Sequence, residues 1–400
     1  MSISSSVNDR PTHSTSLIFI GIVLMAANLR APVTSVGPVL PDIQAALGLD
    51  GAGAGALNAL PLLIFAILSP VAPRVSARFG LERTLASAAV AIFLGVLMRS
   101  LGSPFMVWAG TVVLSAGIAM ANVLLPALVK RSFSGHKAGS VIAVYAATMA
   151  ATAGFAAGLA VPIAHLPGSD WRWSLGAWAI LALAAVITWL PLQKPGKHDK
   201  AKSGHGHQAA FRSPWKHPIG WYVSLFFAMH SLVFYSIVDW FATYARTQGL
   251  TAQTAGVYLL AYQIVSVATN LACAPLIRRS KNQVWLGFGC GILLLAGTAG
   301  MLFAPAANLA WIILLGLGAG VAMTTSLSLF ALRTRDHHQA AALSGMGQFI
   351  GYIGAASGPL LFGILHDISG GWSSPLALLI LASILVMVFA PLAGRARHID

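Results

Sequence analysis

The sequence predicts an all-α membrane protein that crosses the bilayer twelve times, as two pseudo-symmetric six-helix bundles. Three observations predict this fold class: an apolar composition, repeated apolar segments of membrane-spanning length, and similar patterns in the two halves. Of the 400 residues, 57% are hydrophobic and 8% are charged, and the mean hydropathy is +0.78. A soluble domain carries about 25% charged residues, so the composition excludes an ordinary soluble protein.

The apolar segments have the length of helices that cross a bilayer. They run from 18 to 27 residues, and about 20 apolar residues span roughly 30 Å of hydrocarbon. Glycine and proline inside such helices are tolerated where neighbouring helices satisfy the freed carbonyl groups. We expect spans at 16–41, 55–72, 84–102, 105–129, 139–164, 172–191, 219–245, 252–276, 284–304, 308–331, 340–364 and 374–393.

The positive charge is concentrated on one side of this topology. The net charge is +14, and 20 of the 24 Lys and Arg residues fall in the termini and alternate loops. The opposite loops hold only Arg99, Arg172 and Arg246, and Arg30 lies within a span. Because cytoplasmic loops are enriched in Lys and Arg, the charge indicates cytoplasmic termini rather than a nucleic-acid partner.

The longest polar connection divides the chain into six spans plus six. This segment, 192–218, is rich in lysine and typical of a flexible, solvated linker. We expect a cytoplasmic tail at 1–15, an N-terminal bundle at 16–191, the cytoplasmic linker at 192–218, a second bundle at 219–393 and a cytoplasmic tail at 394–400.

The histidines and cysteines do not form a metal or disulfide pattern. In the linker, His198, His205 and His207 lack a neighbouring cysteine or acidic cluster, which favours a solvated segment over a metal site. Cys273 and Cys290 lie inside two spans, where small buried side chains are expected rather than a disulfide. We therefore expect no metal and no cofactor.

The two halves of the chain resemble each other. "GHKAGSVIAVYAATMAATAGFAAG" at 135–158 is similar to "HHQAAALSGMGQFIGYIGAASG" at 337–358, with an offset of 202 residues when His136 is set on His338. Two parallel six-helix halves related by an axis along the membrane normal are the layout of major facilitator transporters. In that layout the substrate site lies near the bilayer midplane between the halves.

The loop between the second and third spans is similar to the major facilitator signature Asp-Arg-x-Gly-Arg-Arg. In "ARFGLER", Arg78, Gly80 and Arg83 match this signature, and the resemblance implies that they act in conformational gating. Ala77 stands where the family carries its aspartate, with Glu82 as a candidate replacement.

A permanent cation lies near the middle of the first span. Arg30 is 14 residues into this span, which is about 21 Å along a helix. An arginine at mid-bilayer costs about 2.5–3.5 kcal/mol on insertion scales, and it does not lose its proton. Thr34 shares its helix face, and Pro32 and Pro38 remove backbone donors, which predicts a kink with free carbonyls. We expect Arg30 and Thr34 to face a wet cavity and bind substrate.

Two residues of the seventh span are candidate partners of this cation. Asp239 could neutralise Arg30 internally, but it lies about 20 residues into its span and is expected nearer the outer surface. His230 lies close to position 232, to which the 202-residue offset maps Arg30. Since histidine titrates near pH 6.5, His230 is a candidate for substrate binding, and both residues are candidates for proton coupling. The structural alternative for His230 is a hydrogen bond between helices.

Further polar side chains recur near mid-span. Each alone is more often a contact between helices than a ligand, but their recurrence at one depth predicts that some of them bind substrate. Gln348 and Tyr352 are four residues apart and share a helix face. The candidates are Asn122, Tyr145, Gln263, Gln348 and Tyr352.

A stripe of glycines in the eleventh span has a simpler interpretation. The residues Gly347, Gly351, Gly354 and Gly358 lie three or four apart, on one side of a helix. Small residues in this pattern let membrane helices approach closely, so we expect this stripe to pack against a neighbouring helix.

Several stretches resemble one branch of the major facilitator superfamily. "NLRAPVTSVGPVLP" (28–41), "ANVLLPALVKRSF" (121–133) and "AALSGMGQFIGYIGAASGPLLFGILHD" (341–367) are similar to the cyanate permease and nitroimidazole exporter branch. The resemblance implies a secondary transporter of the bacterial inner membrane for small polar or anionic compounds, with Arg30 in the most characteristic motif. His230 and Asp239 depart from the exporter-like members.

The sequence therefore predicts a secondary active transporter that moves a small anionic or polar compound by alternating access, with or without proton coupling. Arg30 suits a cyanate-like anion or a small carboxylate through charge-assisted hydrogen bonds, and the nitro group of a nitroimidazole-like compound could also bind there. The alternatives are a multidrug exporter with a loose aromatic site and a membrane receptor that does not transport. We expect a monomer in the lipid bilayer with a small-molecule substrate.

An enzyme is not expected. The sequence contains no HExxH, GxSxG or P-loop motif, and no pair of carboxylates within the spans. A reaction site needs a recognisable constellation of such groups.

Overall fold

The computed structural model of the chain describes residues 15–49, 51–133, 135–192 and 213–399. Most of the predicted linker lies outside the described residues, together with His198, His205 and His207. Nearly all of the predicted N-terminal tail also lies outside them. The described residues are mostly helical, and no strand occurs among them. This confirms the predicted all-α fold class.

The chain up to residue 192 forms ten α-helices and one short 3-10 helix among its described residues. Their bounds are α1 (Thr15–Asn28), α2 (Ala31–Thr34), η1 (Gly37–Val39), α3 (Leu40–Leu47), α4 (Gly51–Leu68), α5 (Ala72–Phe79), α6 (Leu81–Ser100), α7 (Pro104–Ser132), α8 (Gly135–Ala164), α9 (Trp171–Gly176) and α10 (Ala179–Leu192).

The described chain from residue 213 onward forms six α-helices and two 3-10 helices. Their bounds are η2 (Pro214–Lys216), α11 (Pro218–Thr247), α12 (Ala252–Arg279), α13 (Val284–Phe303), η3 (Pro305–Ala307), α14 (Asn308–Leu332), α15 (His337–Ser369) and α16 (Ser373–Gly394).

The helices reproduce the predicted membrane spans. Among the described residues, eleven helical segments are long and apolar enough to cross a bilayer. The twelfth is a bent pair, Ala56–Leu68 and Ala72–Phe79, whose two parts meet at 57°. The first span differs from its prediction at one end, because helical structure continues to Leu47 rather than ending at 41.

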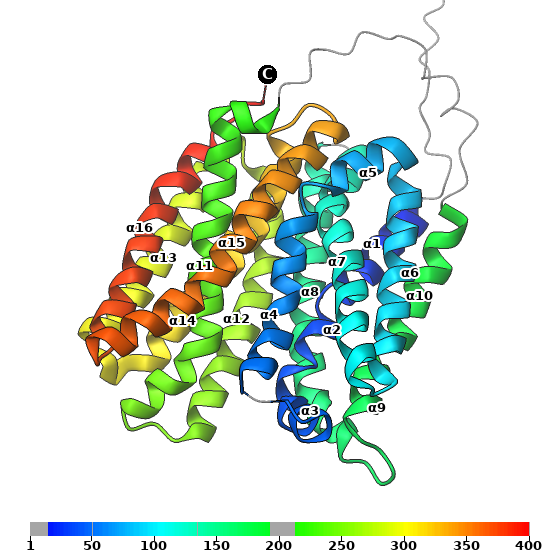
Figure 1. The fold of residues 1–400 in the computed structure, drawn as a ribbon. Coiled ribbons are helices and arrows are strands. Elements are labelled where there is room, and N and C mark those ends of the chain that lie inside the picture. Colours follow the sequence, from blue (N-terminus) through cyan, green and yellow to red (C-terminus); the bar gives the residue numbers. More distant parts are fainter. Residues whose placement is uncertain (1–14, 50, 134, 193–212, 400) are drawn as a thin grey trace, which may run out of the picture.

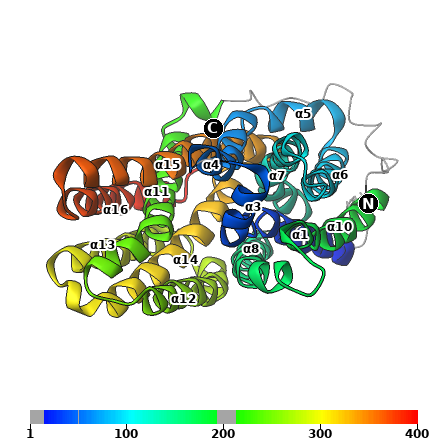
Figure 2. The ribbon, with the colours of Figure 1, turned by 60° about the horizontal axis from the view of Figure 1, so that its bottom comes forward.

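The helices lie in two groups (Figure 1). Helices α1 to α10 form one side of the molecule and α11 to α16 form the other, and Figure 2 shows the same separation from a second direction. The pairs α6 with α7 and α1 with α8 pack inside the first group, and α11 with α15 and α13 with α16 pack inside the second. The groups meet mainly through α8 with α12 and through α15 with α4 and α7.

Glycines allow helices to approach closely inside each group. A Cβ atom on Gly95 of α6 would lie 2.4 Å from the backbone nitrogen of Leu114 in α7. In α15, a Cβ on Gly354 would lie 2.7 Å from the carbonyl oxygen of Ala228 in α11, and one on Gly358 would lie 2.8 Å from that of Leu232. The predicted glycine stripe is therefore a packing surface, as expected.

One end of the molecule carries most of the described basic side chains, and we call it the basic end. It is the end at which α5 and the C-terminus lie (Figure 1, top). There the buried Arg333 donates from Nε to the carbonyl of Ala393 (2.8 Å) and from Nη2 to that of Gly394 (2.8 Å). Burial lowers the pKa of Arg333 to about 10, so it remains charged at neutral pH. These bonds connect the end of α16 to the residue that follows α14.

Candidate substrate site

The first membrane span is broken at Arg30. Helix α1 ends at Asn28 and α2 begins at Ala31, and Arg30 precedes α2 with φ −122° and ψ −45°. The carbonyl of Arg30 accepts the amides of Val33 and Thr34, both at 3.0 Å. Pro32 lies in the first turn of α2, where its missing N–H costs least. The predicted disturbance of this helix is therefore present, and it lies at the level of the cation.

A second arginine forms a hydrogen bond with the backbone at this break. The Nη2 atom of Arg99, in the last turn of α6, donates to the carbonyl of Pro32 at 2.6 Å. The Arg99 side chain is 1% exposed. The charge pattern predicted that Arg99 lies in a loop opposite the basic end, and this was wrong, because Arg99 belongs to the last turn of α6. Its long stem runs inside the bundle to the Pro32 carbonyl, which also accepts the hydroxyl of Ser35 at 3.4 Å.

Arg30 has one hydrogen-bond partner in the described part of the chain. Its Nη1 atom donates to the hydroxyl of Tyr235 in α11 at 2.9 Å, and this bond joins the two groups of helices. No acidic side chain pairs with Arg30 among the described residues. The residue is partly exposed. A guanidinium has five N–H donors, so most of its hydrogen-bonding capacity is available to water or to a ligand.

A buried tyrosine hydroxyl within electrostatic range of this cation also lacks a partner among the described residues. Tyr145 of α8 is 1% exposed, and its hydroxyl makes no hydrogen bond in the described structure. Tyr352 lies within the same range of Arg30. Since buried polar groups normally have a partner, a free hydroxyl next to an under-used guanidinium indicates a place where a polar molecule binds.

Three predicted site residues form a polar layer on the basic side of Arg30. The side-chain amide of Asn122 donates to the hydroxyl of Tyr352 at 3.0 Å, and that of Gln348 donates to the carbonyl of Asn122 at 2.7 Å. The ring of Tyr352 lies 5.1 Å from that of Phe65. All three polar residues are at most 4% exposed. This layer links α7 with α15 and closes the space between the two groups at this depth.

Thr34 is used by the protein rather than left free. Its hydroxyl lies 3.1 Å from the carbonyl of Arg30 and 3.2 Å from that of Ala153 in α8, so it fixes the short helix α2 to α8. Gln263 on α12 is partly exposed and has no hydrogen bond among the described residues. Of these two predicted site residues, only Gln263 has a side chain without a hydrogen bond in the described structure. Its amide is therefore available to a ligand.

His230 lies inside the second group of helices. Its Nε2 atom is 3.1 Å from the hydroxyl of Ser326 in α14. The rings of Phe226 and Phe227 pack against it, with centroids 5.5 and 5.2 Å away, and the residue is 4% exposed. The structure therefore does not bring His230 to Arg30, and its role in binding or proton coupling stays a prediction.

Tyr235 was not predicted as the hydrogen-bond partner of Arg30, although the internal repeat points to its part of the seventh span. The 202-residue repeat offset maps Arg30 to position 232, and both His230 and Tyr235 lie near it. The two residues are five positions apart, which places them about 140° apart around a helix. Only the Tyr235 face is turned toward Arg30, and the sequence contains no measure of which face that is.

The predicted gating loop joins α5 to α6. Gly80 has φ +90°, a conformation that favours glycine. The Arg78 guanidinium carbon lies 5.4 Å from the centroid of the Phe79 ring. Glu82 forms an ion pair with Arg131 at the end of α7, so the carboxylate near the missing aspartate pairs within its own group of helices. A gating role of Arg78, Gly80 and Arg83 stays a prediction.

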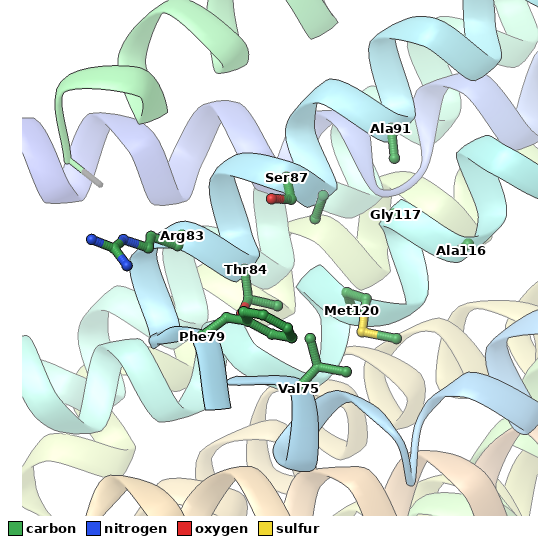
Figure 3. A pocket seen from close by; sticks show the side chains of 10 residues that line it. Val75, Phe79, Arg83, Thr84, Ser87, Ala91, Ala116, Gly117 and Met120 are labelled. Atoms are coloured by element: carbon green, nitrogen blue, oxygen red, sulfur yellow. The ribbon is translucent and has the colours of Figure 1, made fainter. Parts of the chain in front are cut away.

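A separate groove of about 490 Å³ lies between α5, α6 and α7. Figure 3 shows Val75, Phe79 and Met120 gathered along it, with the guanidinium of Arg83 pointing away from them. The groove contains none of the mid-span polar residues around Arg30, so it is distinct from the candidate substrate site.

The fold and this central site define a membrane transporter rather than an enzyme. The chain belongs to the Major Facilitator Superfamily, whose family model matches residues 18–358. The matched residues include the break at Arg30, the predicted gating loop and the polar layer.

Curated relatives place the chain in the predicted branch. It is 36% identical over 395 residues to the 2-nitroimidazole transporter of Escherichia coli (strain K12), covering 97% of this chain and 100% of that protein. It is 38% identical to the uncharacterized transporter YycB of Bacillus subtilis (strain 168), covering 95% and 94%. It is 26% identical to the cyanate transport protein CynX of E. coli, covering 92% and 96%.

Solved structures confirm the fold. The transporter FucP in its outward conformation matches with a TM-score of 0.76 and 13% identity, covering 96% of this chain and all of FucP. The proton:xylose symporter XylE matches with a TM-score of 0.77 and 12% identity, covering 94% of each chain. At this identity the likeness concerns the fold alone.

Proposed function

We propose that the protein is a secondary active transporter that carries a small anionic or electron-rich polar compound across the bacterial inner membrane by alternating access. The observation that carries this proposal is the state of Arg30: a permanent cation at mid-span, partly exposed, with one hydroxyl partner and no acidic partner in the described chain. Such a cation is costly in a membrane and marks a pathway by default.

The neighbours of Arg30 favour a ligand with oxygen acceptors. A carboxylate, a cyanate-like anion or a nitro group can accept from the free N–H groups of Arg30, with charge-assisted bonds. The same ligand can accept from the hydroxyl of Tyr145, which has no hydrogen-bond partner among the described residues. The names of the relatives, a 2-nitroimidazole transporter and a cyanate transport protein, agree with this chemistry.

The contacts between the two groups support a site that opens away from the basic end. Tyr352 packs on Phe65, and a Cβ on Gly345 would lie 2.8 Å from the carbonyl of Ser69. Both contacts lie at or on the basic side of the Arg30 level. We place the basic end and both termini in the cytoplasm because of the charge bias, so this state faces outward, and rocking of the two bundles would expose the site to the other side.

Proton coupling is assigned to the two predicted titratable groups, His230 and Asp239. We propose that the protein acts on a small-molecule substrate as a monomer in the bilayer. His230→Ala or Asp239→Asn should remove the pH dependence of uptake if that residue carries the proton. An unchanged pH profile in both variants would remove both residues from coupling.

A multidrug exporter with a loose aromatic site is the second candidate. It is favoured by an aromatic cluster next to Arg30, in which Phe234 lies 5.3 Å from Tyr235 and 5.9 Å from Tyr262, measured between ring centroids. Competition between chemically unrelated compounds would support it, whereas a strict requirement for one anion would contradict it. Transport into vesicles separates both candidates from a receptor that only binds.

Uptake into proteoliposomes tests the proposal. Cyanate and 2-nitroimidazole are supplied to the wild type, to Arg30→Ala and to Arg30→Lys. We expect uptake of at least one compound by the wild type, loss of uptake in Arg30→Ala, and impaired uptake in Arg30→Lys because an ammonium lacks the planar fork. Arg172→Ala, at an exposed position in the short helix α9, is the matched control. Normal uptake by Arg30→Ala would contradict the proposal.

A further inference from the structure

We infer that Asp239 is a second substrate contact, so that the transported compound is dipolar: an electronegative group binds Arg30, and a hydrogen-bond donor or cationic group binds Asp239. This inference rests on the proposed function of the Arg30 site. It narrows the substrate class from any small anion to compounds that carry both kinds of group.

Asp239 lies on the helix face that meets Arg30. Tyr235, which accepts the hydrogen bond from Arg30, and Asp239 are four residues apart in α11, so they are neighbours on one face. Their separation along the helix axis is about 6 Å. Because α11 begins at the basic end, Asp239 lies on the far side of Arg30, toward the open side of the site.

The carboxylate of Asp239 has no protein partner in the part of the chain that the structure describes. Asp239 is exposed, and it makes no hydrogen bond or ion pair among the described residues. A carboxylate in a membrane-spanning helix is costly in lipid and faces water or a polar partner. Arg246, seven residues further along α11, is the nearest basic residue on this helix, and it forms no ion pair with Asp239.

The first span is loosely packed beyond Arg30. It continues through Gly37 and Pro38, both of which are exposed. No atom lies within 4 Å of where a Cβ on Gly37 would be, so this part of the span has free space beside it.

The two charges select for a particular kind of compound. A simple anion gains contacts with Arg30 but also meets the negative field of Asp239. A compound with an acceptor at one end and an N–H donor at the other end of a single ring satisfies both. A site whose acceptor is placed to receive a hydrogen bond discriminates against an analogue that lacks the donor. Asp239 thus determines specificity, whereas Arg30 provides the main attraction.

Binding of matched ligand pairs to the purified full-length protein tests this inference. Benzoate and cyanate carry an acceptor group without a donor, and 4-aminobenzoate and 2-nitroimidazole carry both. Dissociation constants are measured by titration calorimetry for the wild type, Asp239→Asn, Asp239→Ala and the control Asp367→Asn. Asp367 is strongly exposed near the end of α15. It lies 15 residues beyond Tyr352 in the same helix.

We expect the wild type to prefer the donor-bearing member of a pair. In Asp239→Ala that member should bind about tenfold more weakly, which corresponds to the loss of one charge-assisted hydrogen bond, while benzoate and cyanate bind equally well or more tightly. Asp239→Asn, which keeps a carbonyl acceptor, should lie between. Asp367→Asn should match the wild type.

The outcomes separate this inference from the function on which it rests. If Arg30→Ala abolishes binding of both pairs while Asp239→Ala weakens both members equally or neither, the dipolar class is wrong and the Arg30 site survives. If Asp239→Ala keeps the preference but loses the pH dependence of uptake, Asp239 carries a proton instead. Wild-type binding of only the donor-free compounds, or of none of the four, contradicts the inference.

Discussion

At the scale of single residues, the site depends on hydroxyl and guanidinium groups that the protein leaves incompletely bonded. Arg30 makes one hydrogen bond, to Tyr235, and the hydroxyl of Tyr145 makes none in the described structure. Neither state is favourable for a folded protein without water or a ligand. We therefore propose that Tyr235 positions the cation and that the hydroxyl of Tyr145 binds the substrate.

Replacing each tyrosine by phenylalanine distinguishes these roles. Tyr235→Phe removes a hydrogen bond donated by a guanidinium, so we expect it to lower the free energy of unfolding by about 1.5–3 kcal/mol. Tyr145→Phe removes a hydroxyl without a protein partner, so stability should be unchanged or slightly higher, while ligand affinity falls. Thermal unfolding in detergent, with and without ligand, measures both effects. Equal destabilisation by both variants would contradict the assignment.

The sequence located the cation, its broken helix and the polar layer, because charge, proline and amide side chains are visible in a one-dimensional pattern. It did not locate Tyr235, and it placed Arg99 in a loop. Both errors have one physical cause. The direction of a side chain around its helix, and the reach of a long arginine stem into a bundle, depend on neighbouring helices that the sequence does not specify.

At the scale of helices, close approach depends on glycines rather than on large apolar side chains. The stripe in α15 was predictable from its spacing, and the structure supplies its partner, α11. Lipid offers apolar contacts as good as those of leucine, so association of membrane helices depends on how closely their backbones approach.

Substitution of a glycine in this stripe should disrupt packing. In Gly354→Ala the new Cβ would lie 2.7 Å from the Ala228 carbonyl oxygen, so we expect a loss of about 1–3 kcal/mol in unfolding free energy. The matched control is Gly154→Ala in α8, where no atom lies within 4 Å of the new Cβ. The control should be neutral or stabilising, given the helix propensity of alanine. Similar melting temperatures for both variants would exclude the packing role.

At the scale of the whole molecule, composition and repeated spans were enough to predict the fold. The helical span pattern and the family followed from hydropathy and internal similarity, because a bilayer permits few architectures. The conformational state could not be predicted in this way. It depends on which ends of the two bundles touch, and here the contacts of Tyr352 with Phe65 and of Gly345 with Ser69 lie toward the basic end.

The proposed orientation is testable by labelling in intact cells. Asn282→Cys lies in the turn between α12 and α13 and Gln248→Cys in the turn between α11 and α12, at opposite ends of α12; both positions are exposed. The native Cys273 and Cys290 are at most 1% exposed, so they should give little background. A membrane-impermeant maleimide added outside should label the Gln248→Cys variant only. The reverse pattern would place the basic end outside.

The proposed recognition requires that the guanidinium of Arg30 holds the electronegative group of the substrate. Equilibrium binding of cyanate, benzoate and 2-nitroimidazole is compared between the wild type and Arg30→Gln, whose side chain is uncharged and two atoms shorter. For each compound that the wild type binds, we expect an affinity loss of about 10- to 150-fold, as for a charged hydrogen bond. Equal dissociation constants for the two proteins would contradict it.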